Sequence, residues 1–283
     1  MKLAMFSTLS LSFLLIFASS IFAQQYETIY PNGLTLIARK PLPQKVYLAQ
    51  QNIVEIEGRF FTNEKPHREI TGGQGSGFIE KKSGYVISAR HNIIEAMVEI
   101  WSEHDLPYYI DEKGIPVSKK YHYKFYAIVY TATSKVEYPL EVVGIGPLGT
   151  HADVMAFRPL KQIPVNGLEL FDNPRVGDEV YASGFTGYTT HYHQENGWKV
   201  VVNAGSTKFN FENIVAAVLE DKKITSFGVK RIYKLFGGIE FGFSGGPVLD
   251  RHGQVIAVTI EESKNFLYAI SSQDVRALIK SIK

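Results

Sequence analysis

Short runs of alternating apolar and polar residues recur along the chain and are broken by glycine, proline and asparagine. Successive side chains of a β-strand point to opposite faces, so a period of two predicts strands that are buried on one side. The clearest strands are residues 54–60, 123–130, 135–140 and 198–203, and the clearest helix is 272–282. Short strands separated by turn residues are typical of an antiparallel barrel or sandwich. The pattern therefore predicts an all-β protein that ends in a helix, after a largely polar leader.

The N-terminus has the pattern of an export signal. An apolar run follows Met1 and Lys2 and ends at Ala23. A basic start, an apolar centre and a small residue at the end are the features of a secretory signal peptide, so we expect cleavage after Ala23. An uncleaved membrane anchor is the alternative, because the run approaches the length that spans a bilayer. We therefore expect loss of residues 1–23, export to the periplasm or out of a bacterial cell, and no membrane association after cleavage.

Composition excludes several classes of function. The chain has no cysteine, so an exported fold must rest on packing without disulfides, and thiol catalysis and cysteine metal sites are excluded. A formal net charge of +2 with scattered basic residues does not indicate nucleic-acid binding. His191 and His193 would share one face of a strand, but no carboxylate or third histidine lies near them. We expect no metal and no cofactor.

Ser244 lies in the most distinctive stretch, between Gly242 on one side and Gly245 and Gly246 on the other. Because glycine has no Cβ, the backbone here can turn sharply and approach other groups closely. A hydroxyl beside converging backbone N–H groups provides a nucleophile and a binding site for an oxyanion, as acyl transfer requires. The alternative is a glycine-rich turn without catalytic function, since such short motifs recur by chance.

Two residues upstream complete a catalytic set. A serine hydroxyl needs a base, usually a histidine that a buried carboxylate orients. His91 follows closely after the apolar strand predicted at 85–89, and Asp153 directly precedes the apolar strand predicted at 154–157. The order His91, Asp153, Ser244 excludes the nucleophile elbow of α/β-hydrolases, in which the acid and the histidine follow the serine.

Several motifs occur in one order along the chain: residues 75–78 (Gly-Ser-Gly-Phe), 85–91 (Tyr-Val-Ile-Ser-Ala-Arg-His), 152–157 (Ala-Asp-Val-Met-Ala-Phe), 176–185 and 242–250. This set resembles the chymotrypsin-fold serine peptidases, and among them the bacterial HtrA-like branch. The resemblance covers most of the chain after residue 23. It implies two six-stranded antiparallel β-barrels and a C-terminal helix, with the leader and first barrel in 24–165 and the second barrel and helix in 166–283.

The resemblance also implies a serine endopeptidase that acts on polypeptides, without a cofactor, through an acyl-enzyme on Ser244. Gly242 and Ser244 would supply the N–H groups of the oxyanion hole, and a homo-oligomer is compatible with the branch. Apolar residues near the cleft suggest a small or medium apolar side chain at the cleaved position, whereas an inward Glu240 would favour Lys or Arg. The substrate-binding residues implied are Gly238, Ile239, Glu240, Thr259, Ile260 and Glu261.

Two residues depart from the family pattern. Phe243 stands where Asp or Asn is usual, and we expect this aromatic residue to hold the turn by packing. Arg90 stands where a small residue is usual, and we expect its long side chain to reach solvent. A catalytically impaired peptidase fold that binds peptides is the alternative function, although the intact triad argues against it. Glu-specific secreted relatives are a rival branch, but they carry a histidine where this chain has Thr259.

Overall fold

The computed structural model describes residues 26–29, 35–38, 41–63, 69–92, 94, 98, 108–111, 115–119, 121–130, 135–146, 153–186, 190–195, 198–203, 207–219, 231–237, 242–263 and 266–282. The elements, in chain order, are β1 (Tyr26–Ile29), β2 (Thr35–Ala38), α2 (Gln44–Ala49), η1 (Gln50–Asn52), β3 (Ile53–Thr62), β4 (Glu69–Ile79), β5 (Val86–Ser88), β6 (Tyr109–Ile110), β7 (Pro116–Val117), β8 (Tyr121–Tyr130), β9 (Lys135–Ile145), β10 (Met155–Pro159), β11 (Glu179–Thr186), β12 (Thr190–Glu195), β13 (Trp198–Asn203), β14 (Thr207–Leu219), β15 (Ile232–Phe236), β16 (Pro247–Leu249), β17 (Val255–Ser263), β18 (Phe266–Ser271) and α5 (Ser272–Ser281).

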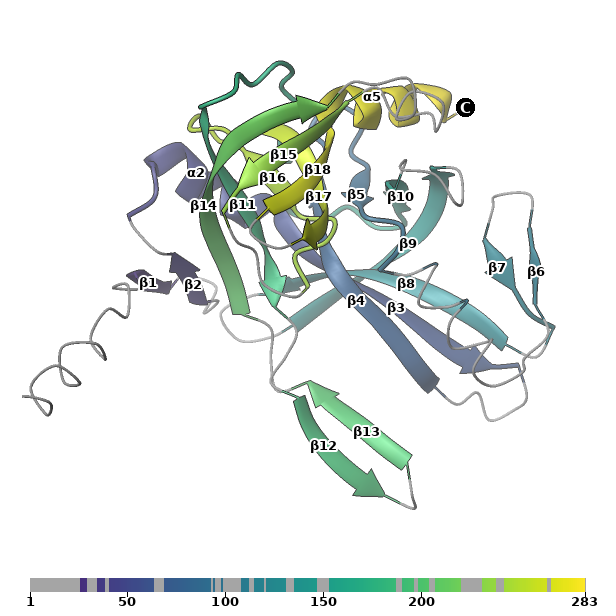
Figure 1. The fold of residues 1–283 in the computed structure, drawn as a ribbon. Coiled ribbons are helices and arrows are strands. Elements are labelled where there is room, and N and C mark those ends of the chain that lie inside the picture. Colours follow the sequence, from purple (N-terminus) through teal and green to yellow (C-terminus); the bar gives the residue numbers. More distant parts are fainter. Residues whose placement is uncertain are drawn as a thin grey trace, which may run out of the picture.

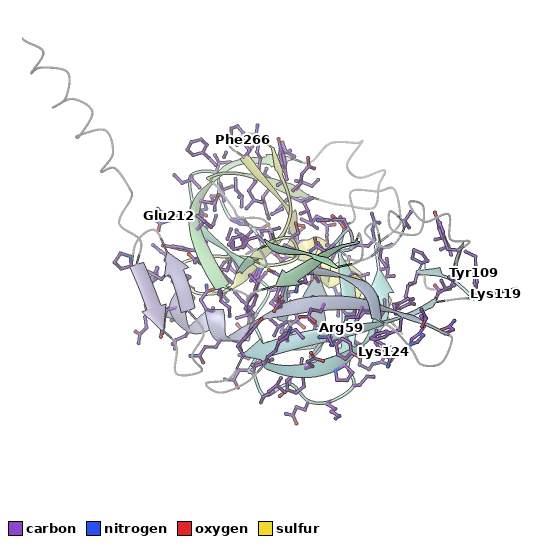
Figure 2. The ribbon with its side chains drawn as sticks, turned by 90° about the horizontal axis from the view of Figure 1, so that it is seen from below. Arg59, Tyr109, Lys119, Lys124, Glu212 and Phe266 are labelled. Atoms are coloured by element: carbon purple, nitrogen blue, oxygen red, sulfur yellow. The ribbon has the colours of Figure 1, made fainter. Side chains whose placement is uncertain are left out.

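The first half of the chain forms a closed antiparallel barrel with the strand order β10-β5-β4-β3-β8-β9 (Figure 1). Period-two alternation explains its core, because Val54 and Ile56 of β3 pack inside the barrel with Phe125 and Phe157, whereas Ile53 points to the other face. Arg59 and Lys124 lie on the outside of this barrel, away from Phe266 and Glu212 of the second barrel (Figure 2). The strands predicted from the alternating pattern at 54–60, 123–130 and 135–140 are confirmed.

The second half forms another six-stranded barrel, in which β14, β11, β16, β17, β18 and β15 follow one another and β15 pairs back with β14. The expectation of an all-β fold with two six-stranded antiparallel barrels and a C-terminal helix is therefore confirmed. The segment 160–178 between β10 and β11 connects the two barrels. The strand predicted at 198–203 is β13, which pairs with β12 in a separate two-stranded sheet.

The N-terminal segment pairs with the second barrel and completes the first. In the hairpin β1–β2, strand β2 pairs in parallel with β14 of the second barrel, so Leu36 lies opposite Lys208. After α2, the chain enters β3, which pairs with β4 and β8 and is needed to close the first barrel. The part of the leader that the structure describes is thus integrated into the fold. The expected signal peptide, residues 1–23, lies outside the described residues, and no helix in the described part of the chain is long and apolar enough to cross a membrane.

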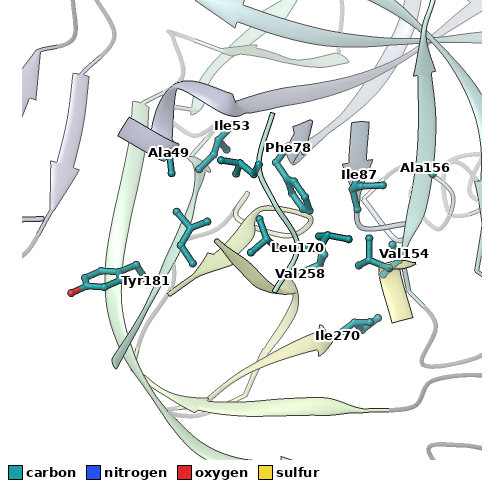
Figure 3. Close-up of a cluster of buried hydrophobic side chains, with 14 of the residues drawn as sticks. Ala49, Ile53, Phe78, Ile87, Val154, Ala156, Leu170, Tyr181, Val258 and Ile270 are labelled. Carbon is teal, nitrogen blue, oxygen red and sulfur yellow. The ribbon is translucent and has the colours of Figure 1, made fainter. Parts of the chain in front are cut away.

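A shared apolar core joins the barrels along a seam. Strands β5 and β10 are buried on both faces, because Val86 and Phe157 face the first barrel's interior while Ile87 and Ala156 face the seam. Figure 3 shows Ile87 and Ala156 in the seam core together with Leu170, Val258 and Ile270. Burial on both faces explains why residues 85–89 and 154–157 are continuous apolar runs. The ends of β5 and the start of β10 therefore lie where the two barrels meet.

Helix α5 covers one end of the seam. Its N-cap is Ser271, whose hydroxyl accepts a hydrogen bond from the N–H of Asp274 at 3.3 Å. Val275 is fully buried in the seam core, and Ile282 just after the helix packs against Gly144 of β9. The helix contacts strands of both barrels, namely β9, β10, β17 and β18. It thus holds the barrels in a fixed relation, which in turn fixes the groups at the seam.

Candidate active site

Ser244 lies in a tight turn just before β16. The N–H of Gly246 donates to the carbonyl of Phe243 at 2.7 Å, which closes a four-residue turn. Gly245 is the third residue of this turn and has φ 87°, a conformation that side-chain-bearing residues rarely adopt. A Cβ at Gly245 would lie 2.3 Å from the carbonyl oxygen of Ser76 and 2.5 Å from the nitrogen of Ala89. Glycine is therefore required for the turn to dock against the first barrel.

Three consecutive carbonyls of this turn are held by hydrogen bonds from the surrounding fold. The hydroxyl of Ser76 donates to the oxygen of Gly242 at 2.8 Å, and the hydroxyl of Thr259 donates to the oxygen of Phe243 at 2.6 Å. The oxygen of Ser244 accepts from the N–H of Ser76 at 2.9 Å and from the side-chain amide of Asn92 at 2.6 Å. Because C=O and N–H point in opposite directions across a trans peptide, fixing the Phe243 carbonyl also fixes the N–H of Ser244.

The N–H groups of Gly242, Phe243 and Ser244 have no acceptor among the hydrogen bonds of the described residues. Gly242 has φ 98°, so the direction of its N–H relative to its held carbonyl depends on a conformation that favours glycine. The N–H groups of Gly242 and Ser244 stay the predicted donors to a bound oxyanion.

The side chain of Phe243 packs in the protein interior and holds the turn in place. Its side chain is fully buried, and its ring meets the edge of Phe211 with a centroid distance of 5.6 Å and an interplanar angle of 81°. A Cβ at Gly184 of β11 would lie 2.2 Å from Cδ1 of Phe243, so the bare glycine backbone provides the space for the ring. The expectation that this aromatic residue packs beneath the turn is confirmed.

Asp153 binds His91 through both carboxylate oxygens. The Oδ2 atom accepts from Nδ1 of the imidazole, and Oδ1 accepts from the backbone N–H of His91 at 2.8 Å. Strand pairing sets this geometry, because Met155 of β10 lies opposite Ser88 of β5 and each catalytic candidate is a few residues beyond that pair. The Asp153 side chain is 14% exposed, against 32% for His91. A proton held on Nδ1 leaves Nε2 as the acceptor for a nucleophile's proton.

The two turns meet across the seam. Asn92, the residue after His91, contacts the carbonyl of Ser244, and the backbone of Gly245 packs on Ala89, two residues before His91. The structure thus brings the turn of His91 and Asp153 from the first barrel against the turn of Ser244 from the second barrel. Ser244 and His91 are thereby carried on neighbouring turns, which is the kind of arrangement that acyl transfer requires.

Comparison with protein families gives one match, to the trypsin-like peptidase domain, over residues 75–258. This match covers more than half of the chain and includes His91, Asp153 and Ser244. The chain belongs to the trypsin-like peptidase family. Comparison with curated protein sequences gives no match.

Solved structures of HtrA-type and related proteases share the fold of this trypsin-like peptidase. The HtrA-type protease AlgW, a serine-to-alanine variant with a tripeptide, superposes with a TM-score of 0.51 at 16% identity, over 84% of this chain and 62% of that chain. The active form of the Rv3671c protease from M. tuberculosis gives 0.51 at 16% identity, over 85% and 84%. The serine endoprotease from Yersinia pestis gives 0.51 at 15% identity, over 84% and 65%. The chain therefore spans less than two thirds of the AlgW and Yersinia chains, and the likeness establishes the chymotrypsin fold.

The structure gives Thr259 of this trypsin-like peptidase a supporting role. Thr259 is fully buried, its N–H donates to Gly246 at 3.0 Å, and its carbonyl accepts from Gly245 at 2.8 Å. These bonds hold the nucleophile turn, and the substrate-binding role of Thr259 stays a prediction. Ile260 lies at a register shift between β17 and β18, and Glu261 beyond it is exposed. Gly238, Ile239 and Glu240 lie outside the described residues.

The position of Arg90 differs from the expectation. Its side chain was expected to reach solvent, but the residue is 3% exposed and its guanidinium donates to the carbonyl of Gly146 at 3.1 Å. The guanidinium can be buried because this end of the first barrel supplies a carbonyl acceptor. Arg90 thereby ties the chain before His91 to the end of β9, which lies beside Asp153.

No sequence motif singles out Asn92 or the hydroxyl of Ser76. Ser76 lies in the Gly-Ser-Gly motif, but the motif does not show that its hydroxyl donates to the Gly242 carbonyl. The side chains of His191 and His193 lie outside the described residues, and the described side chains contain no group of three or more residues that could hold a metal.

Proposed function

We propose that this protein is a serine endopeptidase that hydrolyses peptide bonds through Ser244, His91 and Asp153. The observation that carries the proposal is the pair of hydrogen bonds that His91 donates to Asp153, one from Nδ1 and one from the backbone N–H. A carboxylate bound in this way selects one tautomer and one orientation of the imidazole, and it stabilises the imidazolium that forms during acyl transfer. Membership of the trypsin-like peptidase family supports the same reaction.

In the proposed mechanism, the hydroxyl of Ser244 attacks the peptide carbonyl while Nε2 of His91 accepts its proton. The imidazolium then donates this proton to the leaving amine, and water hydrolyses the acyl-enzyme by the same route in reverse. The N–H groups of Gly242 and Ser244 stabilise the oxyanion of each tetrahedral intermediate. The held carbonyls of the turn support this role, because donors that need no reorganisation stabilise developing charge most effectively.

The proposed substrates are polypeptides in extended conformation. Ile260 and Glu261 lie on β17 close to the nucleophile turn, where an extended chain could lie alongside the strand. The signal-like N-terminus supports an exported enzyme that meets these substrates in the periplasm or outside the cell.

Hydrolysis of an unfolded protein such as reduced casein tests the proposal. The wild-type protein should cleave it, whereas Ser244→Ala, His91→Ala and Asp153→Asn should each lose several orders of magnitude in turnover while keeping the wild-type circular dichroism spectrum. His252→Ala is the matched control, because His252 is exposed on the turn after β16 and should leave turnover unchanged. Full activity in Ser244→Ala, or no cleavage by the wild-type protein, would contradict the proposed function.

A further inference from the structure

Asn92 makes a hydrogen bond that joins the two halves of the site. Its side-chain nitrogen lies 2.6 Å from the carbonyl oxygen of Ser244. A carbonyl only accepts hydrogen bonds, so the amide nitrogen must face Ser244 and the amide oxygen must point away. Asn92 directly follows His91 in the chain, so one residue is attached covalently to the base and by a hydrogen bond to the nucleophile.

The fold makes room for this bond with a glycine. Gly75 of β4 is buried beside the amide, and a Cβ there would lie 2.2 Å from Nδ2 and 2.8 Å from Cγ of Asn92. The next residue, Ser76, donates its backbone N–H to the same Ser244 oxygen at 2.9 Å. The Ser244 carbonyl therefore receives two donors from the first barrel, and one of them depends on the absence of a side chain at Gly75.

We propose that Asn92 is a positioning residue that fixes the His91 turn relative to Ser244. The proposal rests on the proposed function and deepens it. The base comes from the first barrel and the nucleophile from the second, so their distance depends on contacts across the seam. The amide of Asn92 is a direct link between the two turns, and it acts without touching the reacting atoms. Small displacements of a nucleophile from its base lower the rate of reaction steeply.

A cycle of single and double variants tests the proposal. Asn92→Ala removes the donor, Asn92→Asp keeps the size but replaces the donor by an acceptor, and Gly75→Ala keeps the amide but displaces it. Each should lower kcat by about 10- to 100-fold with KM within about twofold, because alignment rather than substrate binding is disturbed. Gly75→Ala should slow the Asn92→Ala variant much less than it slows the wild-type protein, because the added methyl then has no amide to displace.

Turnover is compared on the pH-independent plateau of each variant's own pH profile, so that a change in imidazole protonation caused by the extra charge in Asn92→Asp does not contribute. Asn63→Ala is the matched control, because the amide of Asn63 donates to the carbonyl of Lys119 at 2.7 Å away from the site. It should keep the wild-type kcat. A residue that only filled space would leave Asn92→Asp active, so wild-type kcat in that variant, or in Asn92→Ala, would overturn the proposal.

Urea unfolding of the wild-type protein, Gly75→Ala, Asn92→Ala and the double variant separates this proposal from the proposed function. Gly75→Ala should lower the unfolding midpoint of the wild-type protein by more than that of Asn92→Ala, because only Cβ of residue 92, 3.2 Å from the added methyl, then remains to be displaced. Equal shifts in both backgrounds would overturn the proposed link, even if the enzyme is active. A wild-type protein that shows this coupling but cleaves no peptide would contradict the proposed function instead.

Discussion

Replacing Phe243 by alanine tests whether packing beneath the nucleophile turn holds the oxyanion hole. The ring is fully buried between Gly184 and Phe211, and its own carbonyl accepts hydrogen bonds from Thr259 and Gly246. Removing the ring leaves a void directly under the peptide whose N–H would bind the oxyanion. The substitution therefore disturbs stability and catalysis together.

The expected magnitudes follow from the burial. A fully buried phenylalanine replaced by alanine costs about 3–5 kcal/mol of unfolding free energy. Leucine at the same position should lose mainly the edge contact with Phe211, about 0.5–1.5 kcal/mol. A typical domain has about 5–15 kcal/mol of stability, so most such molecules remain folded at 25 °C. Loss of one aligned oxyanion donor lowers turnover about 100- to 1000-fold, and Phe243→Ala should approach that range.

The assay pairs urea unfolding with the rate of covalent labelling by a fluorophosphonate. Phe157→Ala is the matched control, because Phe157 is equally buried but packs inside the first barrel against Phe125. Both variants should lose similar stability, whereas only Phe243→Ala should label slowly when folded. Labelling at the wild-type rate in folded Phe243→Ala would refute the reasoning.

Three further predictions concern stability, processing and specificity. Burial lowers the pKa of Lys208 from 10.5 to about 7. Between these two pH values the unfolded state binds more protons than the folded state. The free energy of unfolding should therefore rise from about pH 7 to pH 10, by up to about 1.4 kcal/mol per pH unit. Urea unfolding should show this slope in the wild-type protein and not in Lys208→Met, and parallel pH curves would contradict it. The active enzyme should retain β3, since removing it opens the first barrel; an active species that begins near residue 70 by mass spectrometry would contradict this. Cleavage-site profiling on a denatured protein should show cuts after small or medium apolar residues, and dominant cuts after Lys or Arg that Glu240→Gln removes would refute that preference.

The strands and the catalytic candidates could be predicted because their signals are local. Period-two alternation marks β3, β8 and β9, and burial on both faces marks β5 and β10 as continuous apolar runs. The two-barrel architecture came from the resemblance, since alternation alone does not distinguish a barrel from a sandwich. His91 and Asp153 were found because each lies at the end of such a run.

The contacts that support the site could not be predicted, because they join residues far apart in the chain. Nothing in the short strand β2 indicates that it pairs in parallel with β14. Ser76, Asn92 and Thr259 are small polar residues of kinds that occur throughout the sequence, and only the folded chain gathers them around the Ser244 turn. Arg90 was expected in solvent because its acceptor, the Gly146 carbonyl, is not visible in the sequence.

The most direct test of the central claim is the intact mass of the protein after reaction with a fluorophosphonate, followed by mapping of the labelled peptide. The account predicts one label per chain, located on Ser244, and no label on Ser244→Ala or His91→Ala under the same conditions. An unlabelled wild-type protein, or a label that persists in Ser244→Ala, would contradict the account.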